Sequence, residues 1–144
     1  MQEFEICYGL SELPSNAVVT YRKAAKAVIE KDGKLLLIYT NQGDYKFPGG
    51  GYKNSENAAE CIVREMLEET GYQVEKVGKL FGIVLEQKVD DFELGTYFSM
   101  KSEYYSVTID ENNKQKQKLL HFFCMDLEYH SLEIVRRLAH FLRN

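Results

Sequence analysis

Residues 50–72 read GGYKNSENAAECIVREMLEETGY, and the centre of this stretch is predicted to be a helix from Asn57 to Thr70. Asn57 is a favoured N-cap residue, and Glu60 follows it at the spacing of a capping box. Gly71 is typical of the position that ends a helix, because glycine adopts the left-handed backbone conformation without a Cβ clash. The two ends of this helix are therefore predicted from local sequence.

The predicted helix carries three glutamates on one face. With about 100° of rotation per residue, Glu69 lies about 40° to one side of Glu65 and Glu68 about 60° to the other. The residues expected to pack on a sheet lie on the other side of the helix: Ala59, Ile62, Val63, Met66 and Leu67.

This carboxylate face is unfavourable for the helix by itself. Glu65 and Glu69 are like charges at i, i+4, and Glu68 and Glu69 meet the negative end of the helix dipole. A solvated surface face explains such a pattern in many proteins. A site for a hard divalent cation explains it as well, since Mg²⁺ prefers oxygen ligands.

The residues before this stretch are expected to form strands joined by turns. Residues 1–20 are predicted to be a leader strand or arm. A buried strand is predicted from Ala24 to Ile29 and a return strand from Leu35 to Tyr39, with the hairpin turn Asp32-Gly33 between them. The apolar run of the return strand suits a strand covered on both faces. Asn41 to Lys53 is predicted to be a loop.

The residues after the helix are predicted to be mainly strands. A mobile polar loop is expected over 110–118, and a closing helix begins at Ser131 and extends to Asn144. The strands are expected over residues 72–77, 80–86, 92–100 and 119–127. This order indicates a mixed α/β protein, a single domain over residues 1–144 with helices on the faces of a mixed sheet.

Composition limits the partners that this chain can have. The 144 residues have a formal net charge of −4, which argues against binding a nucleic acid polymer. The cysteines Cys7, Cys61 and Cys124 have no zinc-site spacing and are interpreted as reduced thiols of a cytoplasmic protein. The sequence shows no secretion signal at Met1–Glu5 and no apolar run long enough to cross a membrane.

The spacing of the polar residues resembles the Nudix box, G-x5-E-x7-R-E-U-x-E-E-x-G-U, in which U is a bulky aliphatic residue. The one departure is Tyr72 at the last U, which we interpret as a packing variation. Pro48-Gly49 precedes the box, as in that family, and the resemblance extends over roughly residues 20–100. The matching residues are Gly50, Glu56, Arg64, Glu65, Met66, Glu68, Glu69 and Gly71.

The resemblance implies a Nudix-type α/β/α sandwich and a hydrolase that uses Mg²⁺ or Mn²⁺. It implies that the metal ligands are the carboxylates of Glu65, Glu68 and Glu69 and the carbonyl of Gly50. Glu56 and Arg64 are expected to orient these glutamates.

The proton acceptor for the attacking water stays open at the level of sequence. One of the three box glutamates could accept the proton, or a glutamate outside the box could do so, as in some members of the family. The outside candidates are Glu86, Glu93 and Glu103, with Glu103 slightly favoured.

The resemblance also implies a small nucleotide as substrate. Candidate substrate contacts are Lys46, Phe47 and Tyr52, the last two through stacking on a base. Further basic candidates are Arg22, Lys23 and Lys53. Packing or simple solvation explains any of these residues equally well.

The markers of ADP-ribose-cleaving and dinucleoside-polyphosphate-cleaving relatives are absent. Nucleoside triphosphates, oxidised ones included, or nucleotide sugars are therefore expected as substrates. The alternative is a catalytically weak nucleotide sensor, against which the intact glutamates argue. A homodimer is expected only from the habit of the family.

Overall fold

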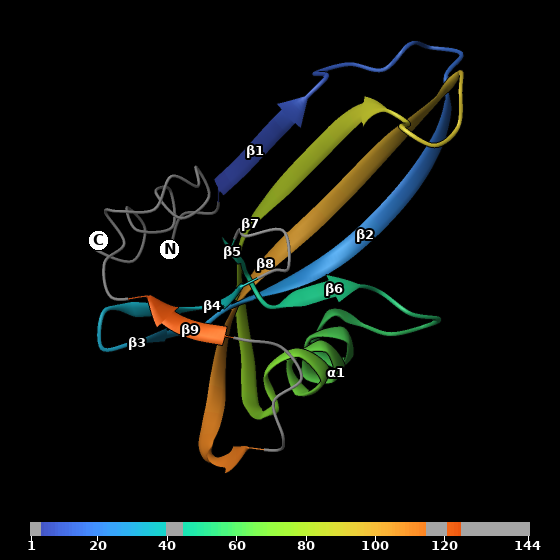
Figure 1. Cartoon of the computed structure of the whole chain (residues 1–144). Helices are drawn as coiled ribbons and strands as arrows, with labels where there is room; N and C mark the ends of the chain where they lie inside the picture. The colour runs from blue at the N-terminus through green and yellow to red at the C-terminus, as the bar shows by residue number, and fades with distance from the viewer. Residues whose placement is uncertain (1–3, 40–44, 115–120, 125–144) are drawn as a thin grey trace.

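The computed structural model describes residues 4–39, 45–114 and 121–124 (Figure 1). The described part contains one helix, α1 (Ala58–Thr70), together with strands. The strands are β1 (Phe4–Gly9), β2 (Val18–Val28), β3 (Glu30–Lys31), β4 (Lys34–Tyr39), β5 (Tyr45–Lys46), β6 (Gly49–Gly51), β7 (Tyr72–Val89), β8 (Thr96–Lys114) and β9 (His121–Cys124). The predicted mixed α/β class is confirmed.

The larger sheet has the strand order β1-β7-β8-β2-β6. It is mixed, because β1 runs parallel to β7 and β2 parallel to β8, whereas the β7–β8 and β2–β6 pairs are antiparallel. Strands β2, β7 and β8 are long and extend away from α1 as an arm (Figure 1). The start of β2, Val18-Val19-Thr20-Tyr21, consists of β-branched and aromatic residues that favour extended backbone.

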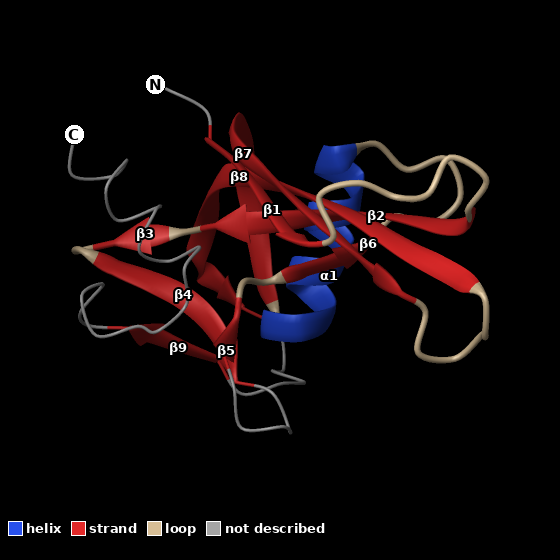
Figure 2. Ribbon diagram, turned by 90° about the horizontal axis from the view of Figure 1, so that it is seen from above, coloured by secondary structure: helices blue, strands red, loops and turns tan. Residues whose placement is uncertain are grey.

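The smaller sheet is built around β4. Strand β4 pairs with β3, β5 and β9, all antiparallel. Leu35, Leu36, Leu37 and Ile38 are all completely buried, which confirms the prediction that this strand is covered on both faces. The strands of both sheets and the single described helix are seen together in Figure 2.

Alternate residues of β2 enter two different apolar clusters. Ala25 and Ala27 belong to the cluster that contains Ile62 and Met66 of α1. Val28 belongs to a second cluster, formed by residues of β1, β4, β7 and β8. The two faces of the sheet are therefore buried separately, one of them by the helix.

Several predicted boundaries are wrong because tertiary pairing extends strands beyond their local signal. The strand predicted from Ala24 to Ile29 begins at Val18 and ends at Val28. Strand β1 lies within residues 1–20, which are predicted to form a leader strand or arm. The predicted loop from Asn41 to Lys53 contains β5 and β6.

The strands after the helix also differ from prediction. The two strands predicted over 72–77 and 80–86 are one strand, β7, with register shifts against β8 near Val77 and Leu80. Strand β8 begins at Thr96, not at Phe92, and continues to Lys114, so residues 110–114 of the predicted loop are strand.

Other predictions fall partly or wholly outside the described residues. Strand β9 lies inside the strand predicted over 119–127, whereas the closing helix 131–144 is not described. Among the described residues, no helix has the length and apolar character that crossing a membrane requires.

The packing side of α1 is shifted from the predicted one. Ile62 and Met66 are buried as expected, but Ala59, Val63 and Leu67 are exposed. Cys61 and Thr70 are buried in their place. The buried side is rotated toward the glycines of β6, which approach the helix closely because they carry no side chains.

Candidate active site

Both ends of α1 are capped as the sequence predicts. The Asn57 Oδ1 accepts a hydrogen bond from the Glu60 N–H at 2.8 Å, and Glu60 Oε1 accepts one from the Asn57 N–H at 3.1 Å. At the other end, Gly71 has the left-handed conformation, with φ of 79°, and its N–H bonds to the Leu67 carbonyl. These caps confine the helix to the segment that carries the glutamates.

Strand β6 brings three glycines alongside this helix. Gly49, Gly50 and Gly51 pair with Lys26, Ala25 and Ala24 of β2. A Cβ on Gly50 would lie 2.6 Å from the Glu65 Oε1, and a Cβ on Gly49 would lie 2.1 Å from the Ala25 carbonyl oxygen. The Glu65 carboxylate thus occupies the space that a side chain at residue 50 would fill.

Arg64 connects the loop before the helix to the carboxylate face. Its Nε and Nη2 donate to the two oxygens of Glu56 at 2.6 and 3.0 Å, and Nη2 also donates to the Gly51 carbonyl at 3.0 Å. Its Nη1 donates to the Glu65 Oε1 at 2.8 Å. The planar guanidinium can serve all these acceptors at once, which fits the predicted supporting role.

The Arg64 network shifts the pKa values of both partners. The hydrogen bond from Arg64, aided by the Lys53 N–H, lowers the pKa of Glu56 to about 2. The bonds to Glu56 and Glu65 raise the pKa of Arg64 beyond its usual range. The pair is fully charged at neutral pH as a result.

Glu69 is the most buried of the three helix glutamates, with 6% of its surface exposed. Its Oε1 accepts a hydrogen bond from the Gly49 N–H at 2.8 Å, and its Oε2 lies 2.9 Å from the Lys46 Nζ. Glu68 is half exposed and lies 3.5 Å from the Arg64 Nη1. The three carboxylates therefore differ in environment although they share one face of the helix.

The donor set fits a hard divalent cation by its chemistry. Glu65, Glu68, Glu69 and the Gly50 carbonyl supply oxygen atoms, the ligands that Mg²⁺ and Mn²⁺ prefer. In the described part of the chain, no group of three or more acidic, histidine or cysteine side chains is already gathered as a metal cage. In this arrangement Glu65 Oε1 accepts a hydrogen bond from Arg64 and Glu69 Oε2 pairs with Lys46.

Glu103 is the candidate outside the box that lies near the glycines. Adjacent strands align Glu103 with Ala25 and Ala25 with Gly50, which places Glu103 about 10 Å from Gly50 across two strand spacings. It is 9% exposed and accepts a hydrogen bond from the Tyr52 hydroxyl at 2.8 Å. The Lys23 Nζ lies 3.2 Å from the same carboxylate.

These partners keep Glu103 ionised. Burial raises the pKa of Glu103, but the hydrogen bonds from Tyr52 and Lys23 more than offset it, so the pKa lies below the ordinary value. Burial and the bond to Glu103 raise the pKa of Tyr52 above its usual range. The Lys23 Nζ also lies over the Tyr52 ring, 5.0 Å from its centroid.

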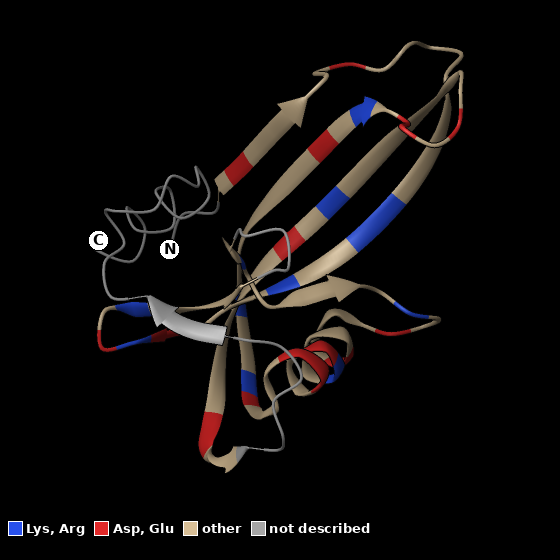
Figure 3. Ribbon diagram, viewed as in Figure 1, with Lys and Arg blue, Asp and Glu red and all other residues tan. Residues whose placement is uncertain are grey.

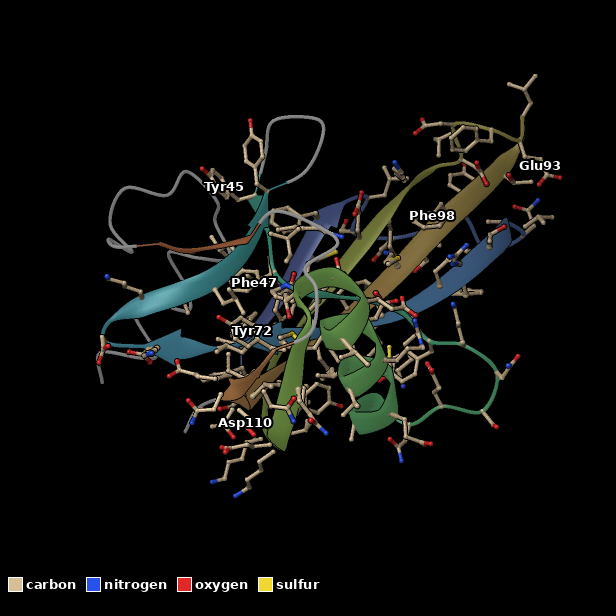
Figure 4. The ribbon with its side chains drawn as sticks, turned by 60° about the horizontal axis from the view of Figure 1, so that its bottom comes forward. Tyr45, Phe47, Tyr72, Glu93, Phe98 and Asp110 are labelled. Atoms are coloured by element: carbon tan, nitrogen blue, oxygen red, sulfur yellow. The ribbon has the colours of Figure 1, made fainter. Side chains whose placement is uncertain are left out.

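The other two candidate bases lie elsewhere. Glu86 is an exposed residue of β7, aligned with Met100. Glu93 belongs to the loop at the far end of the arm, distant from α1 (Figure 4), where it lines a cleft of about 500 Å³ with Arg22 and Phe98 among others. The structure brings neither to the helix glutamates.

The predicted substrate contacts differ in burial and in the residues that they touch. Phe47 is 3% exposed and packs edge-on against Tyr104, with ring centroids 5.5 Å apart, so its ring serves the core. Tyr52 is half-buried in the Glu103 cluster. Lys46 reaches Glu69, whereas the exposed Lys53 contacts Glu56 through its backbone N–H and carbonyl.

Two residues at the site have no predicted role. Cys61 is buried, and its thiol donates to the Gly50 carbonyl at 3.4 Å. Lys26 is the Cα partner of Gly49. The sequence does contain a signal for Lys26, because it is the single lysine within the otherwise apolar strand Ala24–Ile29. An ammonium group inside such a run needs a polar environment.

The charges of the molecule are divided between its elements. Figure 3 shows acidic residues gathered on α1 and basic residues along β2, whereas β7 and β8 carry residues of both signs. Strand β6 pairs with β2, and its Gly50 lies against Glu65 of α1.

Comparison with protein families matches residues 20–140 to the family described as the NUDIX domain. An ADP-ribose pyrophosphatase of Methanocaldococcus jannaschii is 41% identical over 64 residues, which cover 42% of this chain and 37% of that protein. An 8-oxo-dGTP diphosphatase of Buchnera aphidicola is 33% identical over 72 residues, which cover 46% of this chain and 56% of that protein. The matched segment thus spans only about a third to just over half of these relatives.

A solved structure shows the same fold. The ADP-ribose pyrophosphatase of Streptococcus suis superposes with a TM-score of 0.60 at 18% sequence identity, covering 85% of this chain and 87% of the other. At that identity the likeness concerns the fold alone.

Proposed function

Because the chain belongs to the NUDIX domain family, we propose that it hydrolyses a phosphoanhydride in a nucleoside-diphosphate-type substrate with Mg²⁺ or Mn²⁺. The observation that carries this proposal is the cradle formed by Gly50, Glu65 and Arg64. The Glu65 carboxylate occupies the space beside Gly50, and Arg64 holds it there at 2.8 Å. An acid side chain held against a bare backbone segment in this way is poised to share a cation with the neighbouring carbonyl.

We assign the metal to Glu65, Glu68, Glu69 and the carbonyl of Gly50. A bound divalent cation would lower the pKa of an attacking water and neutralise phosphate charge. Arg64 and Glu56 keep Glu65 oriented, and the charged state of this pair at neutral pH suits that task.

We assign proton acceptance to Glu103 rather than to Glu86 or Glu93. Despite its burial, Glu103 has a lowered pKa and so is an unprotonated carboxylate at neutral pH, the form that can accept a proton. Its place in the strand row with Ala25 and Gly50 puts it on the helix side of the sheet. Tyr52 and Lys23 would hold its carboxylate in place and contact the substrate beside it.

The substrate class follows from what the relatives share. One is named for cleavage of ADP-ribose and the other for cleavage of an oxidised deoxynucleoside triphosphate. Both substrates contain a nucleoside diphosphate group, and its phosphoanhydride is the bond that hydrolysis would break. We therefore propose a small nucleotide of this kind, with nucleoside triphosphates first, as the substrate of this chain.

A substrate panel tests the proposal. Nucleoside triphosphates, oxidised triphosphates, ADP-ribose, nucleotide sugars and dinucleoside polyphosphates are incubated with the protein and Mg²⁺, and release of phosphate or pyrophosphate is measured. We expect turnover of at least one substrate, its loss in EDTA, and at least about a hundredfold lower kcat/KM in Glu68→Gln. Glu75→Gln, an exposed carboxylate of β7, is the matched control and should keep full activity.

Two results would contradict the proposal. Turnover that persists in EDTA would remove the role of the metal. A folded protein that binds nucleotides but turns none of them over would favour a nucleotide sensor instead.

A further inference from the structure

Lys46 occupies the carboxylate that the proposed metal would need. Its Nζ lies 2.9 Å from the Glu69 Oε2, and Glu69 is 6% exposed. A carboxylate this buried requires a nearby positive charge or hydrogen bonds to offset its lost hydration. Lys46 and the Gly49 N–H together meet that requirement in the metal-free protein.

Lys46 cannot keep this contact once a divalent cation binds the same carboxylate. An ammonium and a metal ion on one carboxylate would be like charges within a few ångströms of each other. Lys46 is held by the pairing of β5 with β4, in which it aligns with Ile38, so its backbone stays beside the site when its side chain leaves Glu69. Metal binding would therefore free the Lys46 ammonium group from Glu69 while the Lys46 backbone stays beside the site.

Lys26 is a second basic residue at the same place. It is the Cα partner of Gly49, whose N–H bonds to Glu69, and it is only partly exposed. Among the described residues, no ion pair or hydrogen bond is formed by its ammonium group. Burial and then the nearby charge of Lys46 lower its pKa, whereas Glu69 and Glu65 oppose that effect.

Two neighbouring lysines next to neutralised carboxylates form a site for an anion. In the metal-free protein, Glu65 and Glu69 balance Lys26 and Lys46 electrostatically. A divalent cation on these glutamates cancels that balance and leaves two ammonium groups with no counter-charge. A phosphate group would then supply the missing negative charge between them.

We infer that Lys46 is a resident counter-cation that a divalent metal displaces from Glu69, and that Lys46 and Lys26 then bind the phosphate chain of the substrate. This inference rests on the proposed function, since it takes Glu69 to be a metal ligand. It deepens that function by making metal binding precede and create the phosphate site. Metal and lysine thus compete in the absence of substrate and act together in its presence.

The first test is metal affinity without any nucleotide. Binding of Mn²⁺ is measured by isothermal titration calorimetry for the wild type, Lys46→Met, Lys46→Arg and Lys79→Met, an exposed lysine of β7. Lys46→Met should bind Mn²⁺ roughly five- to tenfold more tightly, because the competing charge is gone. Lys46→Arg and Lys79→Met should stay within about twofold of the wild type.

The second test is anion affinity, with imidodiphosphate as a pyrophosphate analogue whose bridge resists hydrolysis. The wild type should bind it at least about tenfold more tightly with saturating Mg²⁺ than in EDTA. Lys46→Met and Lys26→Met should each lose about tenfold of the Mg²⁺-dependent affinity, and Lys79→Met should lose none. Melting temperatures are recorded first, and Lys46→Gln replaces Lys46→Met if the latter does not fold.

The opposite signs of the two effects are the decisive result. A lysine that only stabilises the loop would weaken both affinities together or change neither, and either result would overturn the inference. If the wild type itself binds no Mn²⁺, the proposed function fails. If the wild type binds metal and hydrolyses nucleotides but Lys46→Met binds Mn²⁺ no more tightly than Lys79→Met, only the exchange of Lys46 fails.

Discussion

Arg64 shows how a single residue organises this site. It bonds to Glu56 eight residues earlier, to the Gly51 carbonyl and to the adjacent Glu65. Lysine could not replace it, because one ammonium cannot present paired donors to a carboxylate in a plane and also reach a second acceptor. The predicted pairing of Arg64 with Glu56 is present in the structure, and its effect on activity remains a prediction.

The lowered pKa of Glu56 predicts a particular loss of stability in acid. A carboxyl group with a folded-state pKa of about 2 and an ordinary pKa of 4.5 contributes stability above pH 4.5 and loses it as the pH falls toward 2. The free energy of unfolding of Glu56→Gln should therefore fall less steeply than that of the wild type between pH 4.5 and 2.

Urea denaturation at several pH values in this window measures the effect. Glu75→Gln removes an exposed carboxylate and should keep the slope of the wild type. Equal slopes for Glu56→Gln and the wild type would mean that the bond between Glu56 and Arg64 does not persist in solution.

At the scale of the element, α1 combines an unfavourable set of charges with firm caps. No basic residue lies in its last turn, where Glu68 and Glu69 face the negative end of the helix dipole. The capping box of Asn57 and Glu60, the left-handed Gly71 and the burial of Ile62 and Met66 offset this cost. The helix therefore depends on its packed face for the stability that its carboxylate face removes.

Truncation of the two sides of α1 should have very different effects. Met66→Ala removes a fully buried side chain and should lower the free energy of unfolding by about 2–5 kcal/mol. Val63 is 44% exposed, so Val63→Ala should change the free energy of unfolding by no more than about 0.5 kcal/mol. Thermal and urea denaturation of both variants check this, and a costly Val63→Ala would show that residue 63 is covered in solution.

At the scale of the whole molecule, strands far apart in sequence pair to complete the larger sheet, with β1 at its edge. Strand β1 pairs in parallel with the second half of β7, with Phe4 aligned on Gly82. A Cβ on Gly82 would lie 2.5 Å from the Phe4 ring, so the ring packs directly on the glycine. Because Phe4 belongs to the same cluster as Leu35 and Phe47, this contact joins the N-terminal strand to both sheets.

A double-mutant cycle tests this long-range contact. Gly82→Ala should cost about 1–3 kcal/mol through overpacking, and Phe4→Ala about 3–5 kcal/mol through the cavity that it leaves. In the double variant the new methyl group enters that cavity, so the total cost should be smaller than the sum by roughly 0.5–3 kcal/mol. Strict additivity in urea denaturation would show that the two residues do not touch.

Features that depend on neighbours within a few residues could be predicted from the sequence alone. The ends of α1, the shared glutamate face and the turn at Asp32-Gly33 follow from helix periodicity, capping and the tolerance of glycine for positive φ. The box spacing belongs to this class as well, because its members lie on one helix and the loop before it.

Contacts between side chains on different strands depend on how the strands pair, which no local pattern specifies. Gly49 and Glu69 are 20 residues apart, and Tyr52 and Glu103 are 51 apart. Their contacts arise from the β2–β6 and β2–β8 pairings, whose register is set by burial of whole sheet faces and not by any local signal. For that reason the sequence predicts Lys46, Phe47 and Tyr52 as one group of substrate contacts, although the fold separates them. Phe47 is buried in the core, Tyr52 bonds to Glu103, and Lys46 pairs with Glu69.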